Sequence, residues 1–401
     1  MSRFEALQFL NVAHFFTHFF LLIFPTAALA IGPAWEMSYP SVLALGTPLY
    51  VAFALGTPVA GWLGDKLDRM GLILAFFLGS GIAGIGTAFA TGPMGLMLGL
   101  SGLGLSAAIF HPVANAMIPD LAERTGRALA VNGVFGNLGL AAAALGTGIL
   151  AEVFGWQAAF FVPGLVSTLI GCVLWARRRN GVPPVSAGVA TNRPVVDAGP
   201  RGQRAVFALV CVAALFGGLV FNVITVSLPK LFDERLGALA GDLALIGASA
   251  GLIFFLAAFA QLPVGELLDR FGARRILLGL LSAQIIMLAA LSQASGWIVL
   301  PLALLLVTVM FAELPITGWL LGRYLQSSLR ARAVSVEYLL SLGMGSAALP
   351  AIAVLHANGL GFDVQLGLLA ASTSVVALTA LFLLPADGAS PETHAATTER
   401  V

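Results

Sequence analysis

The chain alternates between long apolar segments and short polar ones. From Gly71 to Pro119 it contains no Asp, Glu, Lys or Arg, although a membrane-spanning helix needs only about 20 apolar residues. Gly92 and Pro93 form a turn signal inside this segment, which therefore predicts two helices joined by a tight loop. The same reading of the whole chain predicts twelve spans, at 8–32, 41–60, 72–90, 95–118, 128–150, 156–176, 205–229, 243–264, 275–294, 297–322, 333–356 and 364–385.

Composition supports a membrane protein. Of 401 residues, 59% are hydrophobic and 10% are charged, whereas a soluble domain has about 45–50% apolar and about 25% charged residues. The formal net charge of +1 lacks the basic surplus that nucleic-acid binding requires. Two cysteines, Cys172 and Cys211, lie inside apolar stretches and cannot form a disulfide framework or a cysteine-based metal site. We therefore expect a lipid bilayer, and no nucleic acid, as a partner.

The basic residues predict the orientation. With twelve spans, every Lys and Arg except Lys230 and Arg235 falls on one side of the membrane. Basic residues are retained on the cytoplasmic side of short loops, so both termini are expected there. The first apolar run begins directly after Arg3 and is too long for a signal-peptide core, so it is expected to remain as the first helix.

The polarity of the chain changes in the middle and at the end. Residues 177–204 are rich in Arg and Pro and poor in apolar side chains, which predicts a cytoplasmic linker. It separates six spans in 1–176 from six in 205–386, and 387–401 is expected to be a disordered cytoplasmic tail. The halves also match at an offset of 204, where Asp65 falls on Asp269. The fold class expected is an all-α membrane protein with twelve transmembrane helices in two six-helix, pseudo-symmetric bundles.

Two loops carry the strongest motif. The stretches are Gly61-Trp62-Leu63-Gly64-Asp65-Lys66-Leu67-Asp68-Arg69 and Gly265-Glu266-Leu267-Leu268-Asp269-Arg270-Phe271-Gly272-Ala273-Arg274-Arg275. With the twelve spans and the linker, they resemble the major facilitator superfamily, whose loop signature is G-x-L-x-D-R-x-G-R-R. The resemblance implies rocking of two bundles around a central cavity, with Asp65, Arg69, Asp269 and Arg270 in gating positions. The first copy departs from the signature at Lys66 and Asp68.

A narrower resemblance is to the fosmidomycin-resistance-like efflux branch. It is carried by Ala108-Ile109-Phe110-His111-Pro112, late in the fourth span. Two signatures of proton-driven drug antiporters are degraded. An apolar residue near Leu98 stands where the fourth helix usually has Arg, and the fifth helix has no proline between Gly139 and Gly148.

Polar side chains inside the spans are the candidate site, because such groups are costly in a bilayer and face a cavity by default. His14 and His18 lie one helical turn apart on one stripe of the first helix. His111 and Glu313 each come about sixteen residues into helices that run inward, so one pocket in the inner half of the membrane is expected. The expected substrate-binding residues are His14, His18, Asn115, Asn137, Asn222 and Tyr338.

Several of these residues have a structural alternative. Glu313 is an isolated carboxyl group deep in a span and is expected to be protonated or paired with a cation, which favours proton coupling. His111 is a second proton-coupling candidate, or it bonds a carbonyl freed by Pro112. The two histidines of the first helix, and the asparagines, can also be packing groups between helices. Glu337 lies near the start of its helix, where gating is favoured over ligand binding.

The sequence favours a transporter over an enzyme. No third ligand is evident for the His14–His18 pair, no Ser-His-Asp set is present at membrane depth, and no nucleotide-binding motif follows the glycine-rich runs. No metal or cofactor is expected. The absence of Lys and Arg inside the spans argues against an anionic substrate.

The expected function is secondary active transport of a small lipophilic, neutral or cationic molecule, by proton-coupled efflux across the bacterial cytoplasmic membrane. One alternative is a symporter or facilitator for uptake of a small polar metabolite. A second alternative is a receptor or scaffold on the same fold, which the lack of a sizeable soluble domain disfavours. A monomer is expected, in line with the resemblance.

Overall fold

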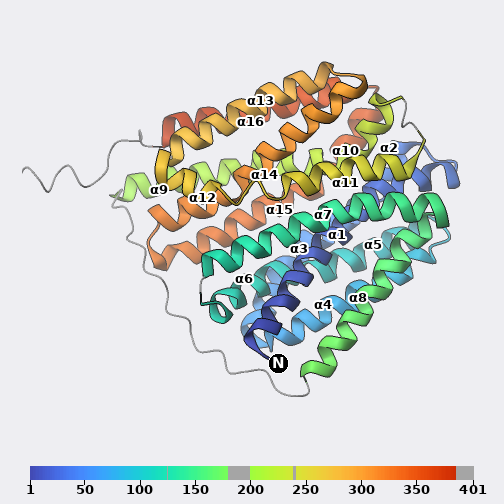
Figure 1. Cartoon of the computed structure of the whole chain (residues 1–401), viewed down its shortest axis with the longest axis horizontal. Coiled ribbons are helices and arrows are strands. Elements are labelled where there is room, and N and C mark those ends of the chain that lie inside the picture. Colours follow the sequence, from blue (N-terminus) through green and yellow to red (C-terminus); the bar gives the residue numbers. More distant parts are fainter. Residues whose placement is uncertain (124, 179–198, 238–240, 385–401) are drawn as a thin grey trace, which may run out of the picture.

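The computed structural model describes residues 1–123, 125–178, 199–237 and 241–384, which are helical almost throughout (Figure 1). The first half holds α1 (Arg3–Ala34), α2 (Tyr39–Ala44), α3 (Thr47–Lys66), α4 (Arg69–Ala88), α5 (Pro93–Ala107), α6 (Phe110–Leu121), α7 (Thr125–Phe154) and α8 (Trp156–Arg178). The second half holds α9 (Gly199–Val212), a π-helical turn (Ala213–Gly217), α10 (Gly218–Arg235), α11 (Leu243–Ala257), α12 (Val264–Phe271), α13 (Ala273–Gln293), a 3₁₀ turn (Gly296–Ile298), α14 (Val299–Tyr324), α15 (Ser327–Ala357) and α16 (Phe362–Leu383). Most of the expected linker, 179–198, and the expected tail, 387–401, lie outside the described residues.

When helices that follow each other across a short break are counted as one, eleven helical segments among the described residues are long and apolar enough to cross a membrane. The eighth expected span is not among them, because the prediction of a single helix over 243–264 is wrong. There α11 ends at Ala257 and α12 begins at Val264. Pro263 explains the break, because proline has no backbone N–H and disfavours the helical conformation of the residue before it. The all-α, twelve-segment organisation is confirmed.

Prolines also divide two other expected spans. The span at 41–60 contains α2 and α3, with Pro48 in the first turn of α3. The span at 95–118 contains α5 and α6, which are separated by residues 108–109, and Pro112 follows in the first turn of α6. A proline is tolerated in the first turn of a helix, where its missing N–H needs no partner. The second break sets the direction from which His111 enters the protein interior.

Helix α1 has a well-defined start and a central place in the first half. The Ser2 hydroxyl accepts a hydrogen bond from the Glu5 backbone N–H at 3.1 Å, and Glu5 accepts one from the Ser2 N–H at 2.7 Å. This reciprocal cap satisfies two N–H groups that would otherwise be unpaired. Glu5 also pairs with Arg177 of α8 at 2.9 Å. The rest of α1 packs against α7 and touches α4, α5, α6 and α8, so its polar side chains point into the protein.

The two halves lie side by side and touch along two lines. Figure 1 shows α9 to α16 grouped on one side of the molecule and α1 to α8 on the other. Helix α7 packs against α11, and α3 packs against α15. The first contact is very close, since a Cβ at Gly148 would lie 2.4 Å from the Leu243 carbonyl oxygen and one at Gly247 2.4 Å from the Ala144 carbonyl oxygen. Only glycine permits this approach of the two helix backbones.

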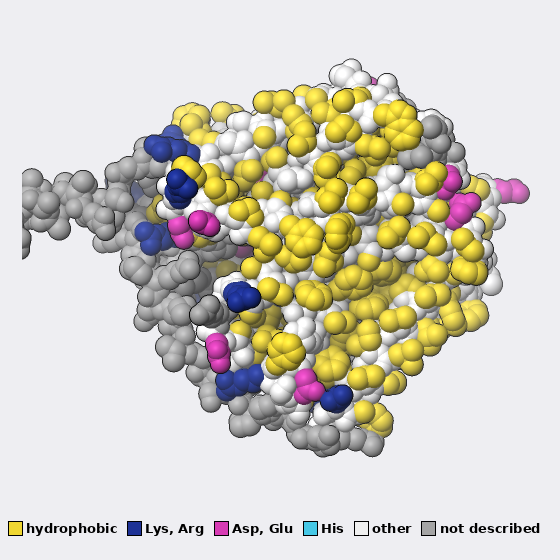
Figure 2. All heavy atoms as spheres, in the orientation of Figure 1, with side chains coloured by type: hydrophobic (Ala, Val, Ile, Leu, Met, Phe, Trp, Pro, Cys, Tyr) yellow, Lys and Arg dark blue, Asp and Glu magenta, His cyan; other side chains and the backbone are white. Residues whose placement is uncertain are grey.

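Charged side chains collect at the two ends of the molecule. On the face shown in Figure 2, a broad apolar band separates Lys, Arg and acidic residues at one end from acidic residues at the other. We call the end with residues 66–69 and 271–273 the basic end, and the end with α2 and residues 241–242 the opposite end. This distribution suits a protein embedded in a bilayer, whose hydrocarbon core is about 30 Å thick.

At the opposite end the halves are held together by polar and aromatic contacts. The rings of Tyr39 in α2 and His356 in α15 are 5.7 Å apart, and the Lys230 ammonium lies 5.2 Å from the Tyr39 ring. The Leu243 backbone N–H donates to Glu152 at 3.1 Å. The molecule is therefore closed between its halves at this end.

Candidate functional site

Helix α1 places two histidines side by side. His14 and His18 lie four residues apart, and their Nε2 atoms are 3.1 Å apart. The Nδ1–H of His14 donates to the Asn132 carbonyl oxygen at 2.7 Å. A carbonyl can only accept, so this bond fixes the proton of the neutral ring on Nδ1 and leaves the Nε2 lone pair facing His18. The expected common stripe of these two side chains is present, and both are partly buried.

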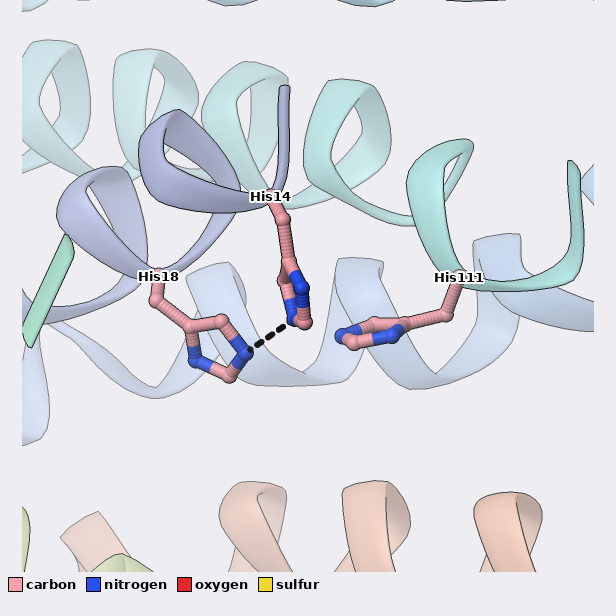
Figure 3. A group of neighbouring side chains, drawn as sticks. All are labelled: His14, His18 and His111. Carbon is pink, nitrogen blue, oxygen red and sulfur yellow. Dashed lines mark hydrogen bonds between the residues drawn. The ribbon is translucent and has the colours of Figure 1, made fainter. Parts of the chain in front are cut away.

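A third histidine completes the group. His111 of α6 points its ring toward the two histidines of α1 (Figure 3). Its ring centroid lies 5.2 Å from that of His14 and 5.5 Å from that of His18. The side chain is buried, and its Nε2 has no hydrogen-bond partner. The expectation that the His14–His18 pair lacks a third ligand-type side chain is therefore wrong. The third residue comes from a distant helix, which residue spacing cannot reveal.

The surroundings of the three histidines (the histidine cluster) are set by α7. Asn132 donates from Nδ2 to the Asn11 side chain at 3.0 Å and to the Leu10 carbonyl at 3.2 Å. One turn further, a Cβ at Gly136 would lie 2.6 Å from His14 Nε2. Asn132 positions His14 and Gly136 makes room for it, yet neither was among the expected site residues. The polar Asn132 within an apolar span was the available signal.

One residue of the second half reaches this group. The Tyr338 ring of α15 lies 5.6 Å from the His111 ring, and its hydroxyl has a polar neighbour in Asn115 of α6. Two expected site residues, one from each half, thus meet beside His111. This contact spans the interface that would have to open for a substrate to pass.

The other expected binding residues lie apart. Asn137 is buried, and its Nδ2 has no partner. Asn222 of α10 donates to the Gly218 carbonyl at 2.8 Å and to the Ser341 carbonyl of α15 at 3.5 Å. Asn222 therefore bonds backbone groups of its own helix and of a neighbouring helix, as an interhelical packing residue does. The substrate-binding roles stay predictions.

The carboxyl groups of α14 and α15 form a second polar region. Glu313 is partly buried, and its Oε1 has no partner. Thr317 lies one turn along α14 from Glu313 and is a polar neighbour of Glu337 of α15. Residues four apart are neighbours on a helix surface, so Glu337 lies near the side of α14 that carries Glu313. Among the described residues, the one group of mutually close metal-ligand side chains is the histidine cluster, which does not include Glu313.

In the first loop motif, Arg69 makes most of the connections. It donates to the Gly64 carbonyl at 3.1 Å and lies 3.5 Å from Asp120 of α6. Its distance to Asp65 is 4.0 Å, and the Asp65 side chain is 81% exposed. Asp68 caps α4 by accepting from the Met70 and Gly71 backbone N–H groups at 3.2 and 3.0 Å. Asp68, which departs from the signature, thus serves as the N-cap of α4.

The second loop motif is built differently. Asp269 accepts a hydrogen bond from the Trp319 indole N–H at 3.2 Å, and the Arg270 guanidinium lies 5.2 Å from the Phe271 ring. Gly272 has φ +84°, a left-handed conformation that favours glycine. The gating roles of both motifs stay predictions.

Comparison with known proteins gives related families and folds. A family model described as the Major Facilitator Superfamily matches residues 9–254. The multidrug resistance protein MdtG of Rahnella sp. (strain Y9602) is 28% identical over 242 residues, which are 59% of this chain and 57% of that protein. MdtG of Proteus mirabilis (strain HI4320) is 27% identical over 269 residues, or 65% of each chain. The matched region thus spans less than two thirds of the length of these relatives.

Solved structures share the fold over nearly the whole chain. A bacterial homologue of the human lysosomal transporter Spinster, inward-facing and occupied, has a TM-score of 0.75 at 16% identity, with 95% of this chain and 97% of that chain covered. A POT family transporter in complex with 5-aminolevulinic acid has a TM-score of 0.71 at 13% identity, with 94% and 95% covered. At these identities the likeness concerns the fold alone.

Proposed function

Because this chain belongs to the major facilitator superfamily, and is therefore a multi-pass membrane transporter of small molecules and not an enzyme, we propose that it is a proton-coupled exporter. In this proposal it moves a small lipophilic, neutral or cationic molecule across the bacterial cytoplasmic membrane by alternating access. The bundles 1–176 and 205–386 rock against each other, and the protein acts as a monomer with both termini in the cytoplasm. The concentration of Lys and Arg on one side of the membrane supports this orientation.

The contact between Tyr338, Asn115 and His111 carries the proposal. It joins polar side chains of both halves at the interface that must separate during alternating access. Tyr338 directly follows Glu337, whose polar neighbour on α14 is Thr317. A series of polar groups therefore leads from the region of Glu313 to the histidine cluster. We assign proton coupling to Glu313 and His111, because ionisable groups inside a membrane protein mark proton relays.

The chemistry around the histidine cluster supports a lipophilic or cationic substrate. Phe110 stacks on His14 with ring centroids 4.7 Å apart, and Phe53 lies 6.3 Å from His111. Aromatic faces attract cations as well as apolar groups. The names of the MdtG relatives refer to multidrug resistance, which is in line with such a substrate. We place His14, His18, Asn115 and Tyr338 among its contacts.

Two further parts of the proposal concern binding and gating. Asn137 has an unpaired buried Nδ2 that a substrate can use, and Asn222 is assigned as a substrate contact from the second half. The closed opposite end supports an inward-facing conformation, in which the basic end opens. Closing the basic end then involves the gating residues Asp65, Arg69, Asp269, Arg270 and Glu337.

Uptake of a small polar metabolite is the second candidate, by symport or facilitated diffusion. The amide groups of Asn11, Asn115 and Asn132 near the histidines favour it, because a hydrogen-bonded site suits a polar substrate. The direction of transport and the dependence on protons distinguish the two candidates.

The test is proton movement in proteoliposomes with an imposed pH gradient. The panel contains lipophilic cations, antibiotics, sugars and amino acids, and the variants are Glu313→Gln and the control Glu152→Gln. Glu152 is a carboxylate at the opposite end, where Gln keeps an acceptor oxygen for Leu243. We expect one class of compound to move protons with the wild type and the control, and not with Glu313→Gln. Equal proton movement in all three would remove Glu313 from the mechanism. Counterflow without proton movement in the wild type would identify a facilitator.

A further inference from the structure

Three imidazole rings from two helices meet inside the first half. We propose that His14, His18 and His111 bind a divalent transition-metal ion through their Nε2 atoms and leave a fourth coordination position open. This metal site goes beyond the proposed transport function and does not rest on it. The ligand-type nitrogens of the three side chains all lie within 4.8 Å of one another, and Figure 3 shows the rings converging from α1 and α6.

The geometry is close to that of a tetrahedral site. Zn–N bonds of about 2.0–2.1 Å place two nitrogen ligands about 3.3 Å apart. The Nε2 atoms of His14 and His18 are 3.1 Å apart, so this pair needs a change of only about 0.2 Å. The ligand nitrogen of His111 lies at most 4.8 Å from those of the other two histidines. To reach the ligand separation of about 3.3 Å, it has to move inward by at most about 1.5 Å. Rotation of its side chain supplies a movement of that size without a change in the backbone.

The hydrogen bonds around the site suit a metal ligand. A metal-binding histidine nearly always donates its other ring N–H to a carbonyl, a carboxylate or water. His14 does so, because its Nδ1–H donates to the Asn132 carbonyl at 2.7 Å. Asn132 is itself held by Asn11 at 3.0 Å. The lone pair of His14 Nε2 is therefore presented to the centre of the cluster before any ion arrives.

The other two rings are also compatible with an ion. His111 Nε2 is buried without a hydrogen-bond partner, and leaving a buried polar atom unpaired is unfavourable. A metal ion would give this nitrogen the partner that it lacks. His18 Nε2–H donates to His14 Nε2 in the absence of an ion. On binding, the neutral His18 ring takes the Nδ1–H form, so its Nε2 becomes a ligand and no net proton is released.

The ligand set selects the kind of ion. Neutral imidazoles suit Zn²⁺, Ni²⁺, Co²⁺ and Cu²⁺, whereas Mg²⁺ and Ca²⁺ need oxygen ligands. The cluster contains no carboxylate, so a bound ion keeps its double positive charge. That charge favours a hydroxide or another small anion at the fourth position, as in three-histidine zinc sites with one open position. His14 and His18 are only partly buried, which leaves access for the ion and for the anion.

The test is direct binding of Co²⁺ and Zn²⁺ to the full-length protein in detergent, purified with an affinity tag that contains no histidine. The reference is the variant His356→Gln/His394→Gln, since it keeps only the three histidines of the cluster. We expect one Co²⁺ per chain, with the strong visible absorption of tetrahedral Co²⁺, displaced by Zn²⁺. Azide should change this absorption if the fourth position is open.

Single substitutions then identify the ligands. In the reference background, His14→Gln, His18→Gln and His111→Gln should each weaken Co²⁺ affinity by at least about tenfold. His18→Cys should keep the site and add a sulfur-to-metal absorption band, and this checks the site in a variant that retains a ligand. Absence of Co²⁺ binding in the reference protein would overturn the proposal. Unchanged affinity in the three Gln variants would overturn it too. Substrate transport in the presence of a chelator is a separate measurement, so failure of the metal site leaves the proposed transport function open.

Discussion

The contact between Gly148 of α7 and Gly247 of α11 makes a strong prediction about conformational balance. A Cβ at Gly247 would lie 2.4 Å from the Ala144 carbonyl oxygen and 2.9 Å from the Gly148 Cα. Both atoms belong to the backbone of α7, so no side-chain rotation can relieve the clash. Normal contacts between such atoms are about 3.5 Å, so Gly247→Ala has to separate the helices by about 1 Å. This separation is required only while the opposite end is closed.

The size of the effect follows from the cost of overpacking, which is about 1–3 kcal/mol. If alanine destabilises only the conformation with a closed opposite end, the population ratio of the two conformations changes by about 5- to 150-fold. The sign favours the conformation in which the halves separate at that end. Gly367→Ala in α16 is the matched control, since its Cβ meets nothing within 4 Å. Both substitutions gain a similar helix propensity, about 1 kcal/mol, which cancels in the comparison.

The assay is a distance measurement between two spin labels at the opposite end. One label is placed on Phe154 at the end of α7 and the other on Val364 at the start of α16, after both native cysteines are replaced by serine. Phe154 is 71% exposed and Val364 is 36% exposed, so the labels do not disturb the interface. We expect a longer distance to gain population in Gly247→Ala and not in Gly367→Ala. Identical distance distributions in the two variants would refute the reasoning that this contact limits closure.

Three other predictions concern the polar contacts and the loops. Asp120→Asn should lower the free energy of unfolding by about 0.2–1 kcal/mol and Asp65→Asn by less, because Arg69 lies closer to Asp120. Thermal unfolding of both variants shows which substitution destabilises more, and a larger effect of Asp65→Asn would contradict the prediction. Tyr338→Phe should lower the transport rate about 2- to 10-fold, because it removes the hydroxyl beside Asn115 of the other half, and an unchanged rate would exclude a role for this hydroxyl. Gly272→Ala should destabilise the protein by about 1–2 kcal/mol, because its φ is +84°; equal melting temperatures would show that the loop relaxes.

The sequence predicted where helical segments lie, but it did not predict which of these segments are broken into two helices. Twelve apolar segments follow directly from hydropathy, because backbone polar groups in a bilayer must be satisfied within a helix. The breaks between α5 and α6 and between α11 and α12 depend on how Pro112 and Pro263 are accommodated. A proline can kink, end or begin a helix, and neighbouring helices decide which of these occurs.

The candidate site was predictable only in part for a similar reason. Helical periodicity places His14 and His18 together, because it describes neighbours within one helix. It contains no information about which residue of α6 faces them. The sequence therefore links His111 to these two histidines only through its similar depth in the membrane. Asn132 acts on His14 through a backbone carbonyl, which every residue has. The bond that orients His14 was therefore not predictable from side-chain identity, although a polar Asn132 within an apolar span marked the position.

In the proposed rocking of the two halves, the location of a contact decides whether it can change. Arg69 pairs with Asp120, and both belong to the first half, so this ion pair survives any rigid movement of one half against the other. The contacts of Gly148 with Gly247, and of Tyr338 with Asn115, cross between halves. Only contacts of this second kind differ in energy between conformations, and only they can set the conformational equilibrium. In the proposed mechanism, the contact of Tyr338 with Asn115 and His111 therefore links that equilibrium to the histidine cluster.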